Sequence, residues 1–162
     1  LVTGCIDAEE AFSFVDGRLL ALIFSMLAVG AGLQNSGAIS LIVDNIAPFL
    51  GTLSPFYVIF AVFLLTTTLT EIVSNNAVAV IMTPIAISLG SALGMDPRPL
   101  VVAVMIAASC AFATPIGYQT NTFIYSAGGY RFADFMRIGV PLNLIMWAAG
   151  SLIIPLVWPL FP

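Results

Sequence analysis

The amino-acid sequence predicts an all-α fold embedded in a membrane, and two observations carry this prediction. First, 60% of the 162 residues are hydrophobic and only 7% are charged, whereas soluble domains average about 45–50% apolar and about 25% charged residues. A soluble domain of this size has too little interior to bury so many apolar side chains, but a bilayer accepts them on the outside as well. Second, the apolar residues form long runs between short polar breaks, which is typical of membrane helices.

The ionisable residues exclude several other classes of protein. Eight acids and four arginines give a net charge of -4 without a basic or acidic tail, so nucleic acid is not an expected partner. Cys5 and Cys110 are the only cysteines and the chain has no histidine, so neither a disulfide framework nor a Cys/His metal site can form. No nucleophile is paired with a base and no carboxylates cluster, so we expect neither an enzyme nor a bound cofactor.

The start of the chain predicts a fragment. It opens at Leu1 without a methionine, and residues 1–16 carry acids where a signal peptide would carry positive charge. We expect residues 1–162 to form one membrane domain, half of an inverted-repeat transporter whose N-terminal repeat is the other half.

The first fifty residues predict one membrane span between two surface helices. Residues 5–15 suit a short interfacial helix, because Asp7 is placed as its N-cap and two glutamates follow in the first turn. Residues 17–34 are almost entirely apolar and predict the first span. Residues 38–49 place apolar side chains at helical spacing opposite polar ones, so they predict an amphipathic helix on the membrane surface that Pro48 ends.

Residues 55–93 predict a re-entrant hairpin, which enters and leaves the membrane on the same side. Two apolar runs of about fifteen to seventeen residues, at the low end for a span, flank a polar stretch from Thr66 to Asn76. Glu71 supports the hairpin, because an acid beside a helix break is expected at a site inside a membrane. The alternative is two full spans joined by a short polar turn.

The remaining residues predict a discontinuous helix and a last span. Residues 99–127 form the discontinuous helix, because an apolar run to Ala113 is followed by a break that starts at Thr114-Pro115 and by polar residues through Thr122. We expect a loop over residues 128–137 and a last span over residues 138–160, interrupted by two prolines, with interfacial tryptophans.

The four arginines predict the orientation of the spans. If the hairpin returns to the side that it enters from, Arg18, Arg131 and Arg137 fall on one side of the membrane and Arg98 alone falls on the other. The positive-inside rule makes the first side cytoplasmic. The hairpin and the C-terminus at Pro162 are therefore expected on the outside.

The two polar breaks predict a site for a cation and an anion. A helix that ends at a break leaves free carbonyls, which attract a cation such as sodium, and a helix that starts there leaves free amides, which attract an anion. Unpaired backbone at membrane depth costs free energy unless it lines a cavity or a site. Two breaks in one half of a transporter therefore indicate function. Taken alone, either break is also compatible with a simple loop at the membrane interface.

At these breaks the chain resembles the divalent anion:sodium symporter family of the ion transporter superfamily. Ser74-Asn75 match the family's Ser-Asn-Thr signature and Thr114-Pro115 match its Thr-Pro motif, whereas Asn76 replaces the signature threonine. The resemblance covers nearly the whole chain. Residues 114–121 and the sequence Gly-Gly-Tyr-Arg-Phe that begins at Gly128 are closest to the branch of sulfate and uncharacterised permeases.

The resemblance implies sodium-coupled symport of a divalent anion, of the sulfate or dicarboxylate class, by alternating access. It also implies a homodimer, and we expect it in the plasma (inner) membrane. The implied cation-binding residues are Ser74, Asn75, Thr114 and Gly117. The implied anion-binding residues are Ser74, Asn75, Asn76, Thr114, Pro115, Thr120 and Asn121.

Glu71 has two possible roles: it neutralises or gates a cation, or it makes structural hydrogen bonds, which is the interpretation we favour. A proton-coupled antiporter or oxyanion exporter of the same superfamily is the first alternative function. A membrane scaffold that transports nothing is the second.

Overall fold

The computed structural model describes residues 17–161, and within that range every regular element is a helix. The all-α prediction is therefore confirmed for the described residues, while the interfacial helix expected at residues 5–15 lies outside them. The helices are α2 (Gly17–Asn35), α3 (Ala38–Leu50), α4 (Pro55–Thr70), α5 (Asn75–Ala92), α6 (Pro97–Ala108), α7 (Gln119–Gly128) and α8 (Phe132–Val157).

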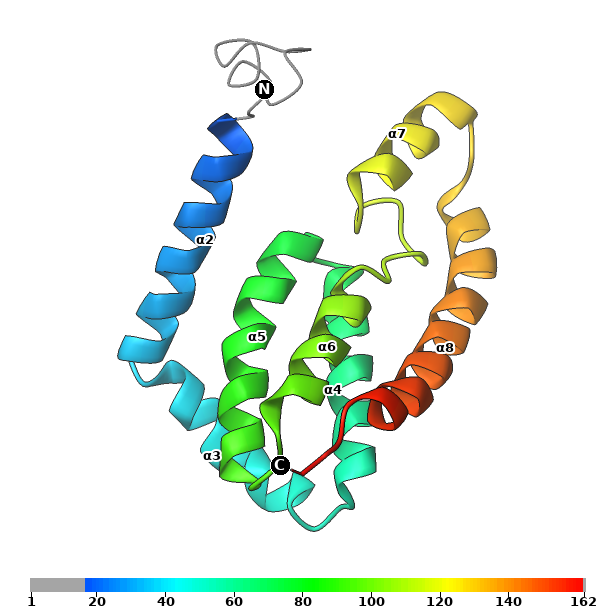
Figure 1. The fold of residues 1–162 in the computed structure, drawn as a ribbon. Helices are drawn as coiled ribbons and strands as arrows, with labels where there is room; N and C mark the ends of the chain where they lie inside the picture. Colours follow the sequence, from blue (N-terminus) through cyan, green and yellow to red (C-terminus); the bar gives the residue numbers. More distant parts are fainter. Residues whose placement is uncertain (1–16, 162) are drawn as a thin grey trace, which may run out of the picture.

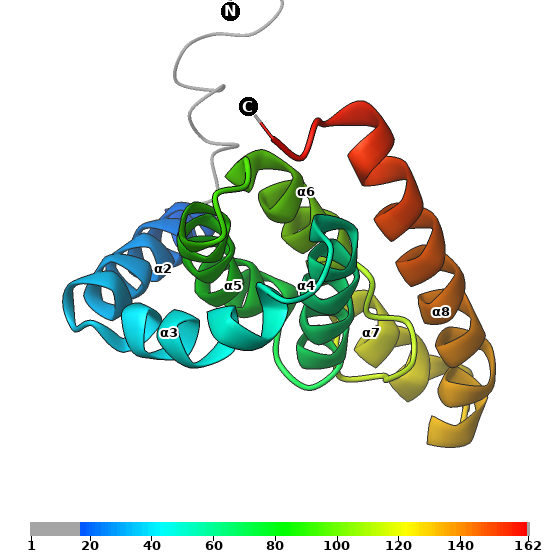
Figure 2. The same ribbon diagram turned by 90° about the horizontal axis from the view of Figure 1, so that it is seen from below.

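Helices α4, α5 and α6 form the centre of the molecule. Helices α2 and α3 lie on one side of them and α8 lies on the other (Figures 1 and 2). The core lies where α4 packs against α6, with Ile59, Phe63, Leu100 and Val104 fully buried. On the outer side, α8 is tied to α4 by the Trp147 indole, whose Nε1 donates to Phe60 O at 2.9 Å.

Two of the described helices, α5 and α8, are long and apolar enough to cross a membrane by length and composition, and α3, α4 and α6 are shorter apolar helices. Large apolar side chains remain exposed on the outer helices: Phe24 is 67% exposed, Ile138 is 72% exposed and Leu156 is 84% exposed. Such surfaces suit contact with lipid or with other protein segments better than contact with water.

Three prolines do not interrupt their helices, contrary to expectation. Pro48 lies inside α3, and Pro141 and Pro155 lie inside α8, which is one continuous helix of 26 residues. A proline removes one backbone hydrogen bond and can bend a helix, but the bonds of the neighbouring turns persist in an apolar environment.

The loop expected over residues 128–137 is also much shorter than predicted. Helix α8 starts at Phe132, because the Asp134 carboxylate in its first turn accepts from the backbone N–H of the N-cap residue, Arg131, at 2.8 Å. The charged residues that suggested a loop therefore lie at the start of α8.

The break of the discontinuous helix lies earlier than predicted. Helix α6 ends at Ala108, the chain is non-helical over residues 109–118, and α7 begins at Gln119. The expected break at Thr114 and the expected polar linker through Thr122 were therefore misplaced. The residues from Ser109 to Ala113 contain neither proline nor glycine, so their local sequence does not explain the unwinding.

The hairpin arms are slightly longer than expected. Helix α4 continues through Thr70, and two of its threonine hydroxyls bond within the helix: Thr66 Oγ1 donates to Val62 O at 2.7 Å and Thr68 Oγ1 donates to Leu64 O at 2.8 Å. Only residues 71–74 separate α4 from α5. This turn lies nearer the middle of the molecule than the start of α2 or the far end of α7 (Figure 1).

Candidate functional site

The turn between α4 and α5 packs directly against the non-helical segment between α6 and α7. We call residues 71–74 the tip turn and residues 109–118 the unwound segment. The Glu71 carboxylate is 9% exposed, and its Oε1 accepts from Phe112 N at 3.0 Å and from Ala113 N at 2.9 Å. Thr114 Oγ1 donates to Glu71 O at 2.7 Å. The two polar breaks that the sequence predicts are therefore in direct contact with each other.

Oxygen atoms from both breaks meet around the Asn75 side chain. One terminal atom of its carboxamide lies 2.7 Å from Thr70 Oγ1, 3.2 Å from Ala108 O and 3.0 Å from Gly117 O. Carbonyl oxygens can only accept, so without a cation the nitrogen must face this group. Rotating the amide by half a turn places Oδ1 there instead. These four residues, Thr70, Asn75, Ala108 and Gly117, then form an oxygen cluster in which the amide nitrogen no longer lies between the two carbonyls.

Gly117 is required at this place by close backbone contact. A Cβ at position 117 would lie 2.8 Å from Thr70 O and 3.0 Å from the Ala111 Cβ, so any larger residue would push the unwound segment away from α4. Thr114 Oγ1 also accepts from Gly117 N at 3.1 Å and holds the segment in this shape.

A cavity of about 360 Å³ lies next to the oxygen cluster. Its residues with polar side chains are Asn75, Ser109, Tyr118, Thr120 and Asn121. Asn121 is fixed toward the unwound segment, because its Nδ2 donates to Ala111 O at 2.8 Å. Three of the predicted anion-binding residues therefore share one cavity, although Asn75 is far from Thr120 and Asn121 in the sequence.

The ends of four helices place partial negative charge on one part of this region and partial positive charge on another. The C-termini of α4 and α6 adjoin each other, because Thr70 Oγ1 donates to Ala108 O at 2.8 Å. The first turns of α5 and α7 supply Asn75, Thr120 and Asn121 to the cavity. Helix C-termini carry partial negative charge and helix N-termini carry partial positive charge. The oxygen cluster thus suits a cation and the adjoining cavity suits an anion.

The other predicted site residues lie around this centre. Ser74 on the tip turn and Asn76 in the first turn of α5 are both exposed, and Ser74 holds the N-cap position of α5 without a side-chain cap bond. Pro115 is buried in the unwound segment, and its carbonyl accepts from Thr122 Oγ1 at 2.7 Å.

Thr70, Ala108 and Asn143 belong to the site but are not among the residues that the sequence predicts. Thr70 is one of several polar residues in the stretch from Thr66 to Asn76, and Ala108 lies in an apolar run that carries no signal. Asn143 is a single amide in an apolar helix, which is a detectable sign of a polar contact inside a membrane protein. Its Nδ2 donates to Glu71 Oε1 at 2.5 Å and so links α8 to the tip turn.

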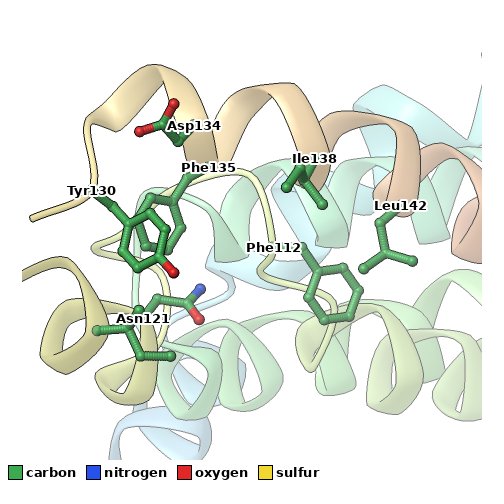
Figure 3. A pocket seen from close by; sticks show the side chains of 9 residues that line it. Phe112, Asn121, Tyr130, Asp134, Phe135, Ile138 and Leu142 are labelled. Atoms are coloured by element: carbon green, nitrogen blue, oxygen red, sulfur yellow. The ribbon is translucent and has the colours of Figure 1, made fainter. Parts of the chain in front are cut away.

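Another cavity, of about 340 Å³, lies between the unwound segment, α7 and α8 (Figure 3). Phe112, Ile138 and Leu142 make much of its lining apolar. Its charged residue, Asp134, is engaged in capping α8. Because the cavity offers few free polar groups, it fits an anion less well than the one at the helix ends.

Comparison with known proteins supports a transport role. A family model described as a citrate transporter matches residues 1–161. An uncharacterised transporter of Synechocystis is 38% identical over 162 residues, 100% of this chain, and one of Escherichia coli is 34% identical over 155 residues, 96% of this chain. Sodium/sulfate cotransporter 2 of Chlamydomonas reinhardtii is 33% identical over 155 residues, 94% of this chain.

The chain spans only part of these relatives. The match covers 26% of the Synechocystis protein, 25% of the Escherichia coli protein and 18% of the Chlamydomonas protein. The relatives are named as transporters, which agrees with the absence of enzyme motifs from the sequence.

Proposed function

This chain belongs to the citrate transporter family, and we propose that it supplies one half of the substrate site of a longer transporter that couples sodium entry to symport of a divalent anion. The observation that carries the proposal is the oxygen cluster of Thr70, Asn75, Ala108 and Gly117 beside a cavity at two helix N-termini. Carbonyl, amide and hydroxyl oxygens suit a hard cation, and free backbone amides suit an anion.

The proposed coupling is electrostatic. A sodium ion in the oxygen cluster would turn the Asn75 carboxamide so that Oδ1 faces the ion and Nδ2 turns away from the carbonyls. The ion would also offset the charge of the nearby anion, which an apolar environment makes costly to bind alone. Anion affinity should therefore rise with sodium concentration, as linkage between two bound ligands requires.

The proposed architecture is a re-entrant hairpin beside a discontinuous helix, repeated in inverted orientation by the N-terminal part of the transporter. The position of the tip turn near the middle of the molecule supports the hairpin (Figure 1). Alternating access would then move this half against the rest of the protein, in a homodimer within the plasma (inner) membrane.

The anion is expected to be sulfate or a di- or tricarboxylate such as citrate, because relatives and family bear these names. We expect Thr120 and Asn121 to contact it with Asn75, while Ser74, Asn76, Thr114 and Pro115 shape the approach from the tip turn and the unwound segment. A sulfate and a citrate uptake assay would distinguish the two substrate classes.

Sodium coupling predicts that uptake survives Glu71→Gln. Glutamine keeps an oxygen that can accept from Phe112 N, Ala113 N and Asn143 Nδ2, whereas a proton carrier needs a group that titrates. The full-length transporter in proteoliposomes should take up radiolabelled sulfate or citrate under an inward sodium gradient at fixed pH. Glu71→Gln should retain this uptake at saturating sodium, and Glu71→Ala should lose it because the unwound segment is no longer held.

Two results would contradict this function. Uptake that follows a pH gradient without sodium, together with an inactive Glu71→Gln variant, would favour the proton-coupled antiporter. Uptake of neither anion under either gradient, by a transporter shown to be folded, would favour the scaffold.

The proposed orientation places Arg131 and Arg137 in the cytoplasm and Arg98 outside. Asp96 N donates to Leu160 O at 3.0 Å, so the start of α6 and the C-terminus lie at one end of the molecule, and the α7–α8 loop lies at the other (Figure 1). In a variant without Cys5 and Cys110, a cysteine at position 98 should react with an impermeant thiol reagent on intact cells. A cysteine at position 131 should react only after permeabilisation, and the reverse pattern would invert the topology.

A further inference from the structure

A third cavity lies between α4 and α8, where Glu71 faces α8. The proposed function assigns no ligand to this cavity. Its volume is about 280 Å³, and its lining includes Thr67, Glu71, Asn143 and Trp147. It shares none of its lining residues with the cavity beside Asn75. It is therefore a separate space, although Glu71, the first residue of the tip turn, also lines it.

Three oxygen atoms in this lining are buried without a hydrogen-bond partner among the described residues. They are Thr67 Oγ1, Glu71 Oε2 and Asn143 Oδ1. Thr67 is 5% exposed and Glu71 is 9% exposed. A buried polar atom without a partner is costly and rare, so three of them at one cavity need an explanation.

The positions of the three residues place them in one neighbourhood. Thr67 and Glu71 are four residues apart and therefore lie on the same face of α4. Glu71 keeps helical backbone angles, with φ -71° and ψ -21°, so this relation extends to the end of the helix. Asn143 reaches the same place from α8, because its Nδ2 donates to Glu71 Oε1.

The missing partner must be small. Glu71 Oε2, as part of a carboxylate, and Asn143 Oδ1 can only accept, so they cannot satisfy each other. All three atoms are already enclosed by this chain, so side chains from the rest of the transporter cannot reach them without opening the α4–α8 packing. A water molecule or a cation fits these conditions.

We propose that Thr67, Glu71 and Asn143 form a second cation site, distinct from the oxygen cluster at Asn75, that takes a monovalent hard cation such as sodium. One carboxylate and two neutral oxygens balance a single positive charge, whereas a divalent ion normally has more carboxylate ligands. A cation here also gives the buried Glu71 carboxylate a counter-charge at membrane depth. The proposal rests on the proposed function in that the bound ion would be a second coupling ion.

Thr67→Val tests the site, because this hydroxyl makes no hydrogen bond in the described structure. If Thr67 had only a packing role, replacing it with valine would remove an unpaired polar atom and leave sodium binding unchanged. The matched control is Thr66→Val, since Thr66 is 0% exposed on the same helix but its hydroxyl already donates to Val62 O. Thr67→Ser keeps the hydroxyl and should therefore bind sodium as the wild-type residue does.

The measurement is the thermal unfolding midpoint of the full-length transporter in detergent as NaCl replaces choline chloride at constant ionic strength. Ligand binding to the folded state raises this midpoint. The assay is carried out in an Asn75→Ala background, which weakens the oxygen cluster. We expect sodium to stabilise Asn75→Ala still, and Thr67→Val to raise the sodium concentration needed for this effect about tenfold, as for loss of one contact to a charged group.

Three outcomes decide the proposal. A sodium requirement raised about tenfold in Asn75→Ala/Thr67→Val, but not in Asn75→Ala/Thr66→Val or Asn75→Ala/Thr67→Ser, supports it. Equal sodium responses in all of these variants would show that the cavity holds water, which overturns the proposal. Abolition of the sodium response by Asn75→Ala alone would leave no second site and also overturns the proposal. Failure of the proposed function would be recognised by a different result, because uptake by the wild-type transporter would then not depend on sodium.

Discussion

Asn75→Ala in the full-length transporter is expected to raise the sodium concentration for half-maximal anion uptake roughly ten- to a hundredfold. The Asn75 carboxamide lies within 3.2 Å of Thr70 Oγ1, Ala108 O and Gly117 O, so its loss removes one oxygen from the proposed cation site. A hydrogen bond or contact to a charged group contributes about 1.5–3 kcal/mol, and each 1.36 kcal/mol corresponds to a factor of ten. The measurement is initial sulfate or citrate uptake into proteoliposomes over a series of sodium concentrations.

Asn45→Ala is the matched control. Asn45 is exposed on α3, and its Nδ2 donates to Leu41 O at 2.7 Å within the same helix. Its truncation should leave the sodium dependence of uptake within about twofold of wild type, because substitutions on an exposed face usually change free energies by less than about 0.5 kcal/mol. Similar small effects from both substitutions would remove the oxygen cluster from the mechanism.

Gly139→Ala is expected to reduce uptake about ten- to a hundredfold, although position 139 is not among the proposed sodium-binding or anion-binding residues. Gly139 is buried in α8, and a Cβ added there would overlap the Phe112 carbonyl and lie 2.5 Å from Ala113 Cα. Backbone cannot move aside as the end of a flexible side chain can, and overpacking costs about 1–3 kcal/mol. The displaced residues are those whose amides bind Glu71 Oε1, so the unwound segment should lose its place against the tip turn.

Gly32→Ala separates this effect from the general effect of alanine in a helix. Gly32 lies inside α2, and a Cβ there would meet nothing within 4 Å among the described residues. Alanine favours a helix over glycine by up to about 1 kcal/mol, so Gly32→Ala should leave uptake and stability at or above the wild-type level. Wild-type uptake and an unchanged unfolding midpoint for Gly139→Ala would show that α8 does not control the unwound segment.

For Glu71, the sequence predicts the kind of role but not the hydrogen-bond partners. Its place at a helix break indicated a polar role inside a membrane, and structural hydrogen bonding was the favoured interpretation. The geometry agrees with hydrogen bonding through Oε1, which accepts from three N–H groups on the unwound segment and α8. The sequence could not name these partners, because they lie 41 to 72 residues away along the chain.

Local sequence patterns were enough to predict the apolar, helical character of the chain, the approximate position of most helices and the existence of two polar breaks. These features follow from composition and from local periodicity, which act within a few turns of helix. The resemblance carried by Ser74-Asn75 and Thr114-Pro115 also led to the transporter family that the comparisons establish.

The start of the second break and the atoms that meet there depend instead on contacts between distant segments. Residues 109–113 could continue α6 by their own propensities, but Phe112 N and Ala113 N donate to Glu71 instead of to the preceding turn. Long-range hydrogen bonds thus offset the helical bonds that are lost. The same contact brings Thr70, Ala108 and Gly117 around Asn75, a convergence that depends on packing between distant segments and therefore leaves no local pattern in the sequence.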